Sequence, residues 1–271
     1  MKTLVRDVLD AIDSIAPWDL AESWDNSGLQ VGDPYSVVHR LGVSLDITPD
    51  IVDEAISAKI DCLLTHHPFL FKPIKTIDFS SIEGSIVYKL ARSGLSIVSA
   101  HTNYDSARNG LNDVLAERIG LCDLAPMLGL KGRFEKDSSV GIGRIGLLPE
   151  EITLSEFAMQ VKTKLGLSHV RFVGQPEKKI RKISICTGSG GSLINDFFEN
   201  GSDLYVSGDL KYHEARDTEA RGKAFLDIGH FGSEILMVEA LSKRLREFFR
   251  DSGRKIEIIE MRSEKEPFVF L

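Results

Sequence analysis

The sequence of 271 residues has few cysteines, no long apolar run and no excess of basic charge. Its cysteines, at positions 62, 122 and 186, are too few and too scattered for a disulfide framework or a CxxC zinc site. We therefore expect reduced thiols and a cytoplasmic protein. No apolar stretch approaches the ~20 residues of a membrane span. The first residues show no apolar signal-peptide segment either.

The charge balance is acidic, with 33 Lys and Arg against 40 Asp and Glu and a formal net charge of -7. This balance disfavours a broad nucleic-acid-binding surface, which is normally basic. The acidic balance is still compatible with a small anionic substrate, because a bound metal ion reverses the electrostatic potential around its site. Hydrophobic residues at 42% and charged residues at 27% are ordinary for a globular core with a solvated surface. The length predicts one large or two modest domains.

Apolar runs that end in polar side chains recur in the first half of the chain. Residues 41–45, 60–64 and 95–100 predict strands, and the segments between them predict helices, one opened by Thr48 and one over 82–91. Consecutive β-α-β units predict parallel strands with right-handed crossovers. Open α/β sheets place their ligands at the carboxyl ends of such strands.

Two adjacent histidines stand where the second of these strands stops. His66 and His67 are followed by Pro68, which cannot continue a strand. Successive side chains on an extended segment point opposite ways, so the two imidazoles would diverge unless each has its own partner. A pair of metal ions would supply those partners. The alternative is a histidine pair in a turn, with one ring solvated and the other packed.

Further imidazoles and carboxylates follow other strand ends. Asp105 comes soon after the strand at 95–100, and His230 and Glu234 share one face at the start of a long helix. Together these clusters predict a metal centre. Five donors exceed the roughly three protein ligands of a catalytic zinc, so we predict two divalent ions, with Glu234 bridging and Asp105 as a terminal ligand. The predicted ligands are His66, His67, Asp105, His230 and Glu234, a set that suits zinc, iron, manganese, cobalt or nickel.

A polar, glycine-bearing stretch from Asp25 to Gly32 predicts an ordered loop, which either connects elements or lines a site. Residues 126–139 are rich in glycine, lysine and acid and predict a domain boundary or a mobile loop. Beyond them we expect strands at 139–148, 170–173, 180–186, 203–206, 224–228 and 255–261, and helices at 153–165, 193–198, 210–215 and 231–250.

A glycine-rich turn could hold an anion. Gly188, Ser189 and Gly190 follow a predicted strand, and backbone N–H groups at a helix N-terminus bind phosphates well. The turn is not a P-loop, because no Lys-Ser/Thr pair follows at the required spacing. Lys211, a basic side chain beside another strand end, is a second candidate for phosphate binding. The alternative for the turn is a tight strand-to-helix connection.

Six ordered motifs give the sequence a family resemblance. It resembles the NGG-interacting-factor-three-like family, also called GTP cyclohydrolase 1 type 2, over nearly the whole chain. The motifs are Trp24-Asp25-Asn26-Ser27-Gly28-Leu29, Thr65-His66-His67-Pro68, Ala100-His101-Thr102-Asn103-Tyr104-Asp105, Gly188-Ser189-Gly190, Ser207-Gly208-Asp209-Leu210-Lys211-Tyr212-His213 and Gly229-His230-Phe231-Gly232-Ser233-Glu234.

The resemblance implies an α/β fold of two similar lobes, with mixed sheets flanked by helices and a metal site in the cleft between them. The first lobe would comprise residues 1–125, completed by 235–271, and the second residues 126–234. The resemblance also implies a dinuclear metal centre on the five ligands above and a toroidal homohexamer. For the family, GTP cyclohydrolase activity, metal handling and protein interaction have all been proposed.

Metal-dependent hydrolysis of a nucleotide is the leading functional prediction. Two close ions lower the pKa of a shared water, which would add to C8 of GTP before a second hydrolysis releases formate. His101 and His213 are candidate proton carriers. Alternatively, His101 orients Asp105 and His213 packs against its helix. Two further functions stay open: a metal-delivery or scaffold protein without catalysis, and phosphoester hydrolysis at the same centre.

Overall fold

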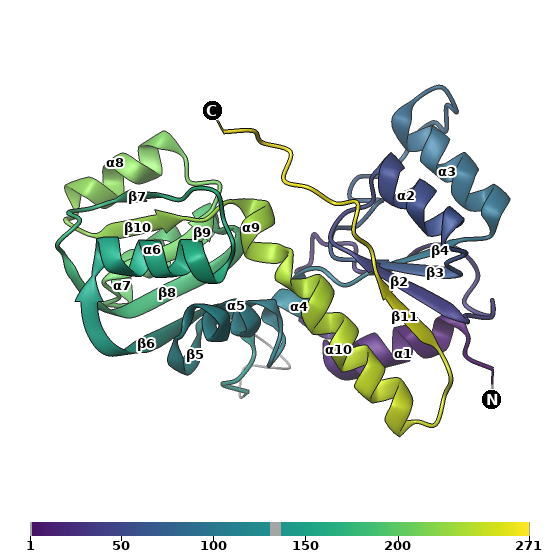
Figure 1. Cartoon of the computed structure of the whole chain (residues 1–271), viewed down its shortest axis with the longest axis horizontal. Helices are drawn as coiled ribbons and strands as arrows, with labels where there is room; N and C mark the ends of the chain where they lie inside the picture. Colours follow the sequence, from purple (N-terminus) through teal and green to yellow (C-terminus); the bar gives the residue numbers. More distant parts are fainter. Residues whose placement is uncertain (1, 131–136, 271) are drawn as a thin grey trace. The chain divides into compact units, whose positions relative to one another are not determined.

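The computed structural model describes residues 2–130 and 137–270. The chain forms two compact units, each built on its own sheet (Figure 1). Unit 1 contains Met1–Tyr104 and Met237–Lys265, and unit 2 contains Asp105–Leu236 and Glu266–Leu271. Both sheets are mixed and carry helices, so the expected α/β fold with mixed sheets is confirmed. In the described part of the chain, every helix is too short or too polar to cross a bilayer.

The sheet of unit 1 has the strand order β1-β4-β3-β2-β11. Strands β4, β3 and β2 run parallel, as the β-α-β pattern predicts. Strand β11 is also parallel to β2, and β1 is antiparallel to β4. The strands are β1 (Gly28–Val31), β2 (Arg40–Ser44), β3 (Cys62–Thr65), β4 (Ser96–Ser99) and β11 (Glu257–Glu260), and the helices are α1 (Val5–Ile15), η1 (Trp18–Leu20), α2 (Pro49–Ser57), α3 (Ile82–Ser93) and most of α10 (Leu236–Asp251).

Local chemistry explains where the helices of unit 1 begin and end. Thr48 caps α2 by accepting a hydrogen bond from the amide of Ile51, and Pro49 occupies the first helical position. Helix α3 ends at Gly94 in the left-handed conformation, with φ of 71°. Helices α2 and α3 lie on one side of the sheet and α1 and α10 on the other (Figure 1). Apolar side chains from α2 and α3 pack on β3 and β4 and form a buried core.

The sheet of unit 2 has the strand order β5-β6-β8-β9-β10-β7, with β8, β9 and β10 parallel and the other pairings antiparallel. Helix α4 (Thr102–Ser106) contains the residues at which unit 1 gives way to unit 2. The strands are β5 (Cys122–Gly129), β6 (Gly141–Thr153), β7 (Arg171–Val173), β8 (Lys179–Ser189), β9 (Leu204–Gly208) and β10 (Ala224–Asp227), and the helices are α5 (Leu111–Ile119), α6 (Leu154–Lys164), η3 (Gly190–Leu193), α7 (Ile194–Glu199), α8 (Tyr212–Ala220) and α9 (His230–Glu234).

Three expectations about the secondary structure need correction. The segment 126–129, expected as loop, belongs to β5, because its backbone pairs with β6 although its side chains are mostly exposed; residues 131–136 lie outside the described part. The single helix expected over 231–250 is two helices, α9 and α10, separated at Ile235. The segment expected as a loop from Asp25 to Gly32 contains strand β1, which pairs with β4. The strand is short, and its residues do not alternate between apolar and polar, so the sequence did not predict it.

Candidate metal centre

The two histidines after β3 do not diverge. The strand ends at Thr65, and the amides of both His66 and His67 donate to the carbonyl of Leu45, each at 3.0 Å. The chain therefore leaves the extended conformation at this point, and the alternation of side chains no longer applies. The two imidazole ring centroids lie 5.2 Å apart. Pro68, next along the chain, is consistent with a backbone that turns here.

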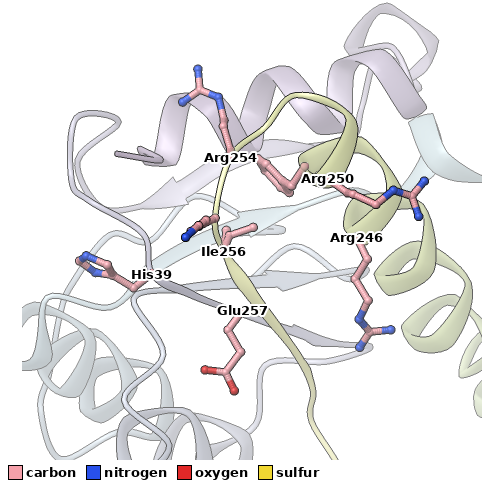
Figure 2. A pocket seen from close by; sticks show the side chains of 8 residues that line it. His39, Arg246, Arg250, Arg254, Ile256 and Glu257 are labelled. Carbon is pink, nitrogen blue, oxygen red and sulfur yellow. The ribbon is translucent and has the colours of Figure 1, made fainter. Parts of the chain in front are cut away.

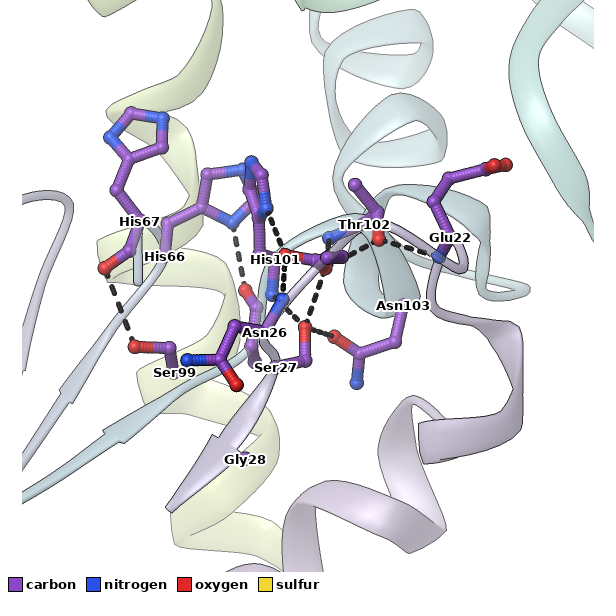
Figure 3. Close-up of polar contacts among 12 residues, drawn as sticks. Glu22, Asn26, Ser27, Gly28, His66, His67, Ser99, His101, Thr102 and Asn103 are labelled. Atoms are coloured by element: carbon purple, nitrogen blue, oxygen red, sulfur yellow. Dashed lines mark hydrogen bonds and ion pairs between the residues drawn. The ribbon is translucent and has the colours of Figure 1, made fainter. Parts of the chain in front are cut away.

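His101 completes a cluster of three imidazoles in unit 1 (Figure 3). It follows β4, the strand next to β3, so parallel pairing brings it beside His66. One ring nitrogen from each of His66, His67 and His101 lies within 4.8 Å of the others. The sequence predicted that His101 either transfers protons or orients Asp105, and did not place it among the metal ligands. The structure places it where it is a candidate metal ligand as well.

Each imidazole of the cluster has Nδ1 next to an oxygen. The three distances are 2.8 Å from His66 to the Ala100 carbonyl, 2.7 Å from His67 to Asp46 Oδ1 and 2.8 Å from His101 to Asp25 Oδ1. Carbonyls and carboxylates only accept hydrogen bonds, so each Nδ1 carries the proton and the lone pair lies on Nε2. Metal-binding histidines typically have this arrangement.

Asp25 holds His101 firmly. Its Oδ2 accepts hydrogen bonds from the hydroxyl groups of Ser27 and Thr102 and from the amide of Thr102. Burial raises the pKa of the Asp25 carboxyl, but the hydrogen bonds from His101, Thr102 and Ser27 outweigh burial and hold this pKa well below its usual value. The loop that contains Asp25 therefore lines the site, and a permanent negative charge stabilises the Nδ1–H tautomer of His101.

Glu264 supports the His67 side of the cluster. Its carboxylate accepts hydrogen bonds from the amides of Leu45 and Asp46, at 2.8 and 2.6 Å. These bonds fix the turn after β2, whose carbonyl and carboxylate bind the histidine pair. Burial raises the pKa of the Glu264 carboxyl despite the two amide donors. No pattern in the sequence pointed to this residue.

Unit 2 gathers a second group of donors. His230 opens α9 directly after Gly229, which has φ of 76°, and its Nε2 lies 3.0 Å from Glu234 Oε2, one helical turn further on. The Nδ1 of His230 lies 2.8 Å from Asp209 Oδ2. Asp209 follows β9 and His230 follows β10, and these strands are parallel neighbours. The donors thus lie at the carboxyl edge of the sheet, as predicted.

Asp105 and Glu234 flank the end of β8. Thr187 donates its hydroxyl to Asp105 Oδ1 at 3.2 Å, and a Cβ on the next residue, Gly188, would collide with Glu234 Oε1. Only glycine therefore fits at position 188, which also has φ of 63°. Glu234 is buried. Within unit 2 the structure brings His230 and Glu234 together, and it places Asp105 against Thr187, the residue before Gly188.

The glycine turn and the remaining predicted residues have other contacts. The amides of Gly188 and Gly190 donate to the hydroxyl groups of Ser233 and Ser207, so these two donors are used inside the protein. Ser189 ends β8 and is exposed. Lys211 is exposed at the N-cap of α8, where its amide binds Glu214. His213 is exposed on the first turn of α8 and packs against the ring of Tyr212. Phosphate binding by the turn and by Lys211, and proton transfer by His213, stay predictions.

A hollow of about 600 Å³ at the opposite edge of the unit 1 sheet does not join the site. It lies at the amino ends of β2 and β11, and Figure 2 shows that its guanidinium groups point apart. Arg246 pairs with Glu260, and Arg254 pairs with Asp7. Because the cations are paired and divergent, they do not form a converging anion site.

Comparison with known proteins identifies the family. The family model described as Duf34/NIF3 (NGG1p interacting factor 3) matches residues 3–267. The chain belongs to the NIF3 family. A relative from Clostridium perfringens, named GTP cyclohydrolase 1 type 2 homolog, is 35% identical over 98% of this chain and 99% of its own length. A homologue of the same name from Clostridium acetobutylicum is 33% identical over the full length of both chains.

Solved structures of the NIF3 family and its neighbours share the fold. A Bacillus cereus protein described as related to NIF3 has a TM-score of 0.94 at 25% identity, and a hypothetical protein of Staphylococcus aureus has 0.93 at 28% identity; both cover 100% of each chain. Reduced HcgD from Methanocaldococcus jannaschii has a TM-score of 0.79 at 30% identity, covering 96% of this chain and 98% of its own. The family resemblance that the six motifs indicated is thus confirmed.

The donors fit divalent metal ions. Imidazole nitrogen and carboxylate oxygen are the ligands preferred by zinc, iron, manganese, cobalt and nickel. Sequence reasoning found the donors but not the carboxylates that orient them, Asp25, Asp46 and Asp209. Each of these acids lies in or directly after a motif or a strand end, which was the available signal. Their partners come from distant segments, so no spacing along the chain reveals the pairing.

Proposed function

We propose that this NIF3 family member is a dinuclear metal protein that hydrolyses a nucleotide, with ring opening of GTP as the reaction to test first. The observation that carries the proposal is the set of four imidazoles whose Nδ1 atoms each face an oxygen at 2.7–2.8 Å. Such pairing fixes both the tautomer and the orientation of a metal-binding histidine. The names of the two Clostridium homologues support a GTP cyclohydrolase-like substrate.

In this proposal, the five predicted ligands would hold two divalent ions. The imidazoles are neutral, so the negative charge of the set comes from Asp105 and Glu234, two charges against the four of two divalent cations. Glu234 would serve as the carboxylate shared by the ions, Asp105 would be a ligand of one of them, and the histidines at 66, 67 and 230 would supply the nitrogen ligands. Divalent ions held there would supply Lewis acidity and lower the pKa of water towards neutrality.

His101 has a second possible task in the reaction, because its Nδ1 is held by an anionic carboxylate. Asp25 stabilises the imidazolium that forms when Nε2 accepts a proton. The same nitrogen then returns the proton to a leaving nitrogen atom of the substrate. A proton carrier of this kind contributes roughly 10²–10⁴-fold to a rate. His101 therefore acts as ligand, as proton carrier or as both in turn.

A second candidate function is metal delivery or scaffolding without catalysis, in a homohexamer in the cytoplasm. A run of exposed apolar side chains in unit 1 favours it, since contiguous exposed apolar surface marks protein contacts. The residues are Ile74, Ile77, Phe79, Ile82 and Tyr88. In this second candidate function, these side chains would form contacts with other subunits.

Turnover of GTP separates the two functions. Protein loaded separately with Mn, Fe, Zn, Co or Ni is incubated with GTP, and formate release is measured beside a Glu234→Ala control. Hydrolysis predicts formate with at least one metal and none with the variant. No metal-dependent formate under any loading would reject ring opening, and transfer of the ions to an apo acceptor would then favour delivery. Generic phosphoesters in parallel test phosphoester hydrolysis.

A further inference from the structure

Two exposed aromatic rings extend the imidazole cluster of unit 1 outwards. Trp24 is 58% exposed and Phe71 is 50% exposed, and their ring centroids lie 5.9 Å apart. The ring of His101 lies 6.0 Å from Trp24 and 6.4 Å from Phe71. The three rings meet edge to face, at interplanar angles of 67–78°. An apolar pair is thus left in water directly beside the candidate metal ligands.

Hydrogen bonds hold this aromatic pair in place before any ligand arrives. Trp24 precedes Asp25, which is bonded to His101 and Thr102. Phe71 follows Leu70, whose carbonyl accepts a 2.8 Å hydrogen bond from the side chain of Asn26. The amide of Leu70 donates to Gln30 Oε1 at 3.2 Å. The loop that orients His101 therefore also fixes the segment that carries Phe71.

Rigid, exposed aromatic faces bind flat aromatic ligands at low entropic cost. Leaving a tryptophan and a phenylalanine in water is unfavourable, at roughly 25 cal/mol per Å² of apolar surface, so a partner is expected. A base stacked on such a ring lies within van der Waals distance of it, and this position is adjacent to the imidazole that would transfer protons. A planar heterocycle placed here would present its edge to the cluster.

We infer that Trp24 and Phe71 form the binding platform for the base of a purine nucleotide. The inference rests on the proposed nucleotide hydrolysis and adds how the substrate is recognised. The platform binds the aromatic base of the nucleotide and not its phosphates. Each residue of the segment Trp24-Asp25-Asn26 then has its own role. Trp24 stacks on the base, Asp25 orients His101, and Asn26 anchors the segment that carries Phe71.

Fluorescence of Trp24 tests the platform directly. The chain has two tryptophans, so Trp18→Phe leaves Trp24 as the only indole. Metal-loaded protein is titrated with guanosine, GTP and inorganic tripolyphosphate. We expect guanosine and GTP to quench the emission and tripolyphosphate to leave it unchanged. Quenching by tripolyphosphate alone, or by none of the three, overturns the inference.

Affinity measurements on variants complete the test. Loss of one stacking ring should weaken guanosine binding on the order of 5- to 100-fold in Trp24→Ala and in Phe71→Ala, with unchanged metal content, and Trp24→Phe should restore part of it. Tyr35→Ala is the matched control, because Tyr35 is 67% exposed in the same unit and its ring lies against the guanidinium group of Arg6. Wild-type affinity in both alanine variants overturns the platform.

The results also distinguish this inference from the proposed function. If guanosine binds through Trp24 but no formate appears, the platform stands and hydrolysis fails. If formate is released with an unchanged KM for GTP by Trp24→Ala, hydrolysis stands and the platform fails. Sedimentation of the same variants tests whether Trp24 and Phe71 instead form a contact between subunits. A changed oligomer mass together with wild-type guanosine affinity would show such a contact and overturn the inference.

Discussion

The two units contribute different chemistry at the same kind of place. Both place donors at the carboxyl ends of parallel strands, but unit 1 offers three imidazoles and unit 2 offers one imidazole and the carboxylates of Asp105 and Glu234. Nitrogen ligands give selectivity for transition metals, and carboxylates supply negative charge that a cation requires. The two groups of donors therefore differ in charge, and the contribution of each group to metal binding can be tested unit by unit.

The units also differ in how they are supported. In unit 2, Arg144 is 1% exposed and bonds both oxygens of Asp113, at 2.5 and 3.0 Å, and it also donates to the carbonyl of Ala107. Ala107 lies just after the helix that carries Asp105. In unit 1, the imidazole cluster is held by hydrogen bonds from histidine rings to carboxylates, among them the bond from His101 to the buried side chain of Asp25. The region next to Asp105 in unit 2 is instead held by a buried guanidinium–carboxylate pair.

Breaking that ion pair should have the largest effect on stability. Arg144→Ala leaves the carboxylate of Asp113 buried without its cation, which costs about 3–5 kcal/mol in the free energy of unfolding. Urea denaturation measures the loss. Arg216→Ala is the control in the same unit, since Arg216 and Glu219 form an exposed pair worth about 0–1 kcal/mol. Equal losses in the two variants would show that the buried pair does not support unit 2.

Loss of the proposed bridging carboxylate should come next. Glu234→Ala removes negative charge and a ligand at once, so we expect metal affinity to fall by more than about 100-fold, beyond the 10–100-fold typical of a supporting residue. Metal content after dialysis against a chelator measures it. Glu247→Ala, an exposed acid of α10, should retain its metal. Wild-type metal content in Glu234→Ala would contradict the bridging role.

The carboxylates that orient a histidine allow the closest comparison of metal binding by the two units. Asp46 holds His67 in unit 1 and Asp209 holds His230 in unit 2, and their side chains are 45% and 46% exposed. We expect each alanine variant to weaken metal binding about 10–100-fold and each asparagine variant less, because the amide oxygen still accepts from Nδ1. Chelator competition gives the affinities. A loss confined to one unit would show that the other does not bind the ions.

Much of this organisation could be predicted from the sequence. The parallel strands of unit 1 followed from apolar runs separated by helical segments. The side chains at 66, 67, 105, 230 and 234 were chosen because they follow strand ends, and their role as metal ligands stays a prediction. Local features carried these predictions, so they needed no knowledge of distant contacts. The convergence of His66 and His67 was missed because it depends on the Leu45 carbonyl, which lies 21 and 22 residues earlier. Likewise β1 depends on pairing with β4 and has no signal of its own.

The reactivity of the cysteine thiols shows how well each sheet protects its buried cysteine from solvent. Of the four comparisons, this one should show the smallest difference between the units. Burial raises the pKa of the Cys62 thiol in unit 1 and of the Cys186 thiol in unit 2 to about 12 in each case, whereas Cys122 is exposed. Since the thiolate is the reactive form, a disulfide reagent at pH 8 should modify one thiol per native chain, and none in Cys122→Ser. In denaturant all three should react. A second fast thiol in the native protein would show that one sheet opens, and Cys62→Ala against Cys186→Ala would identify which unit it is.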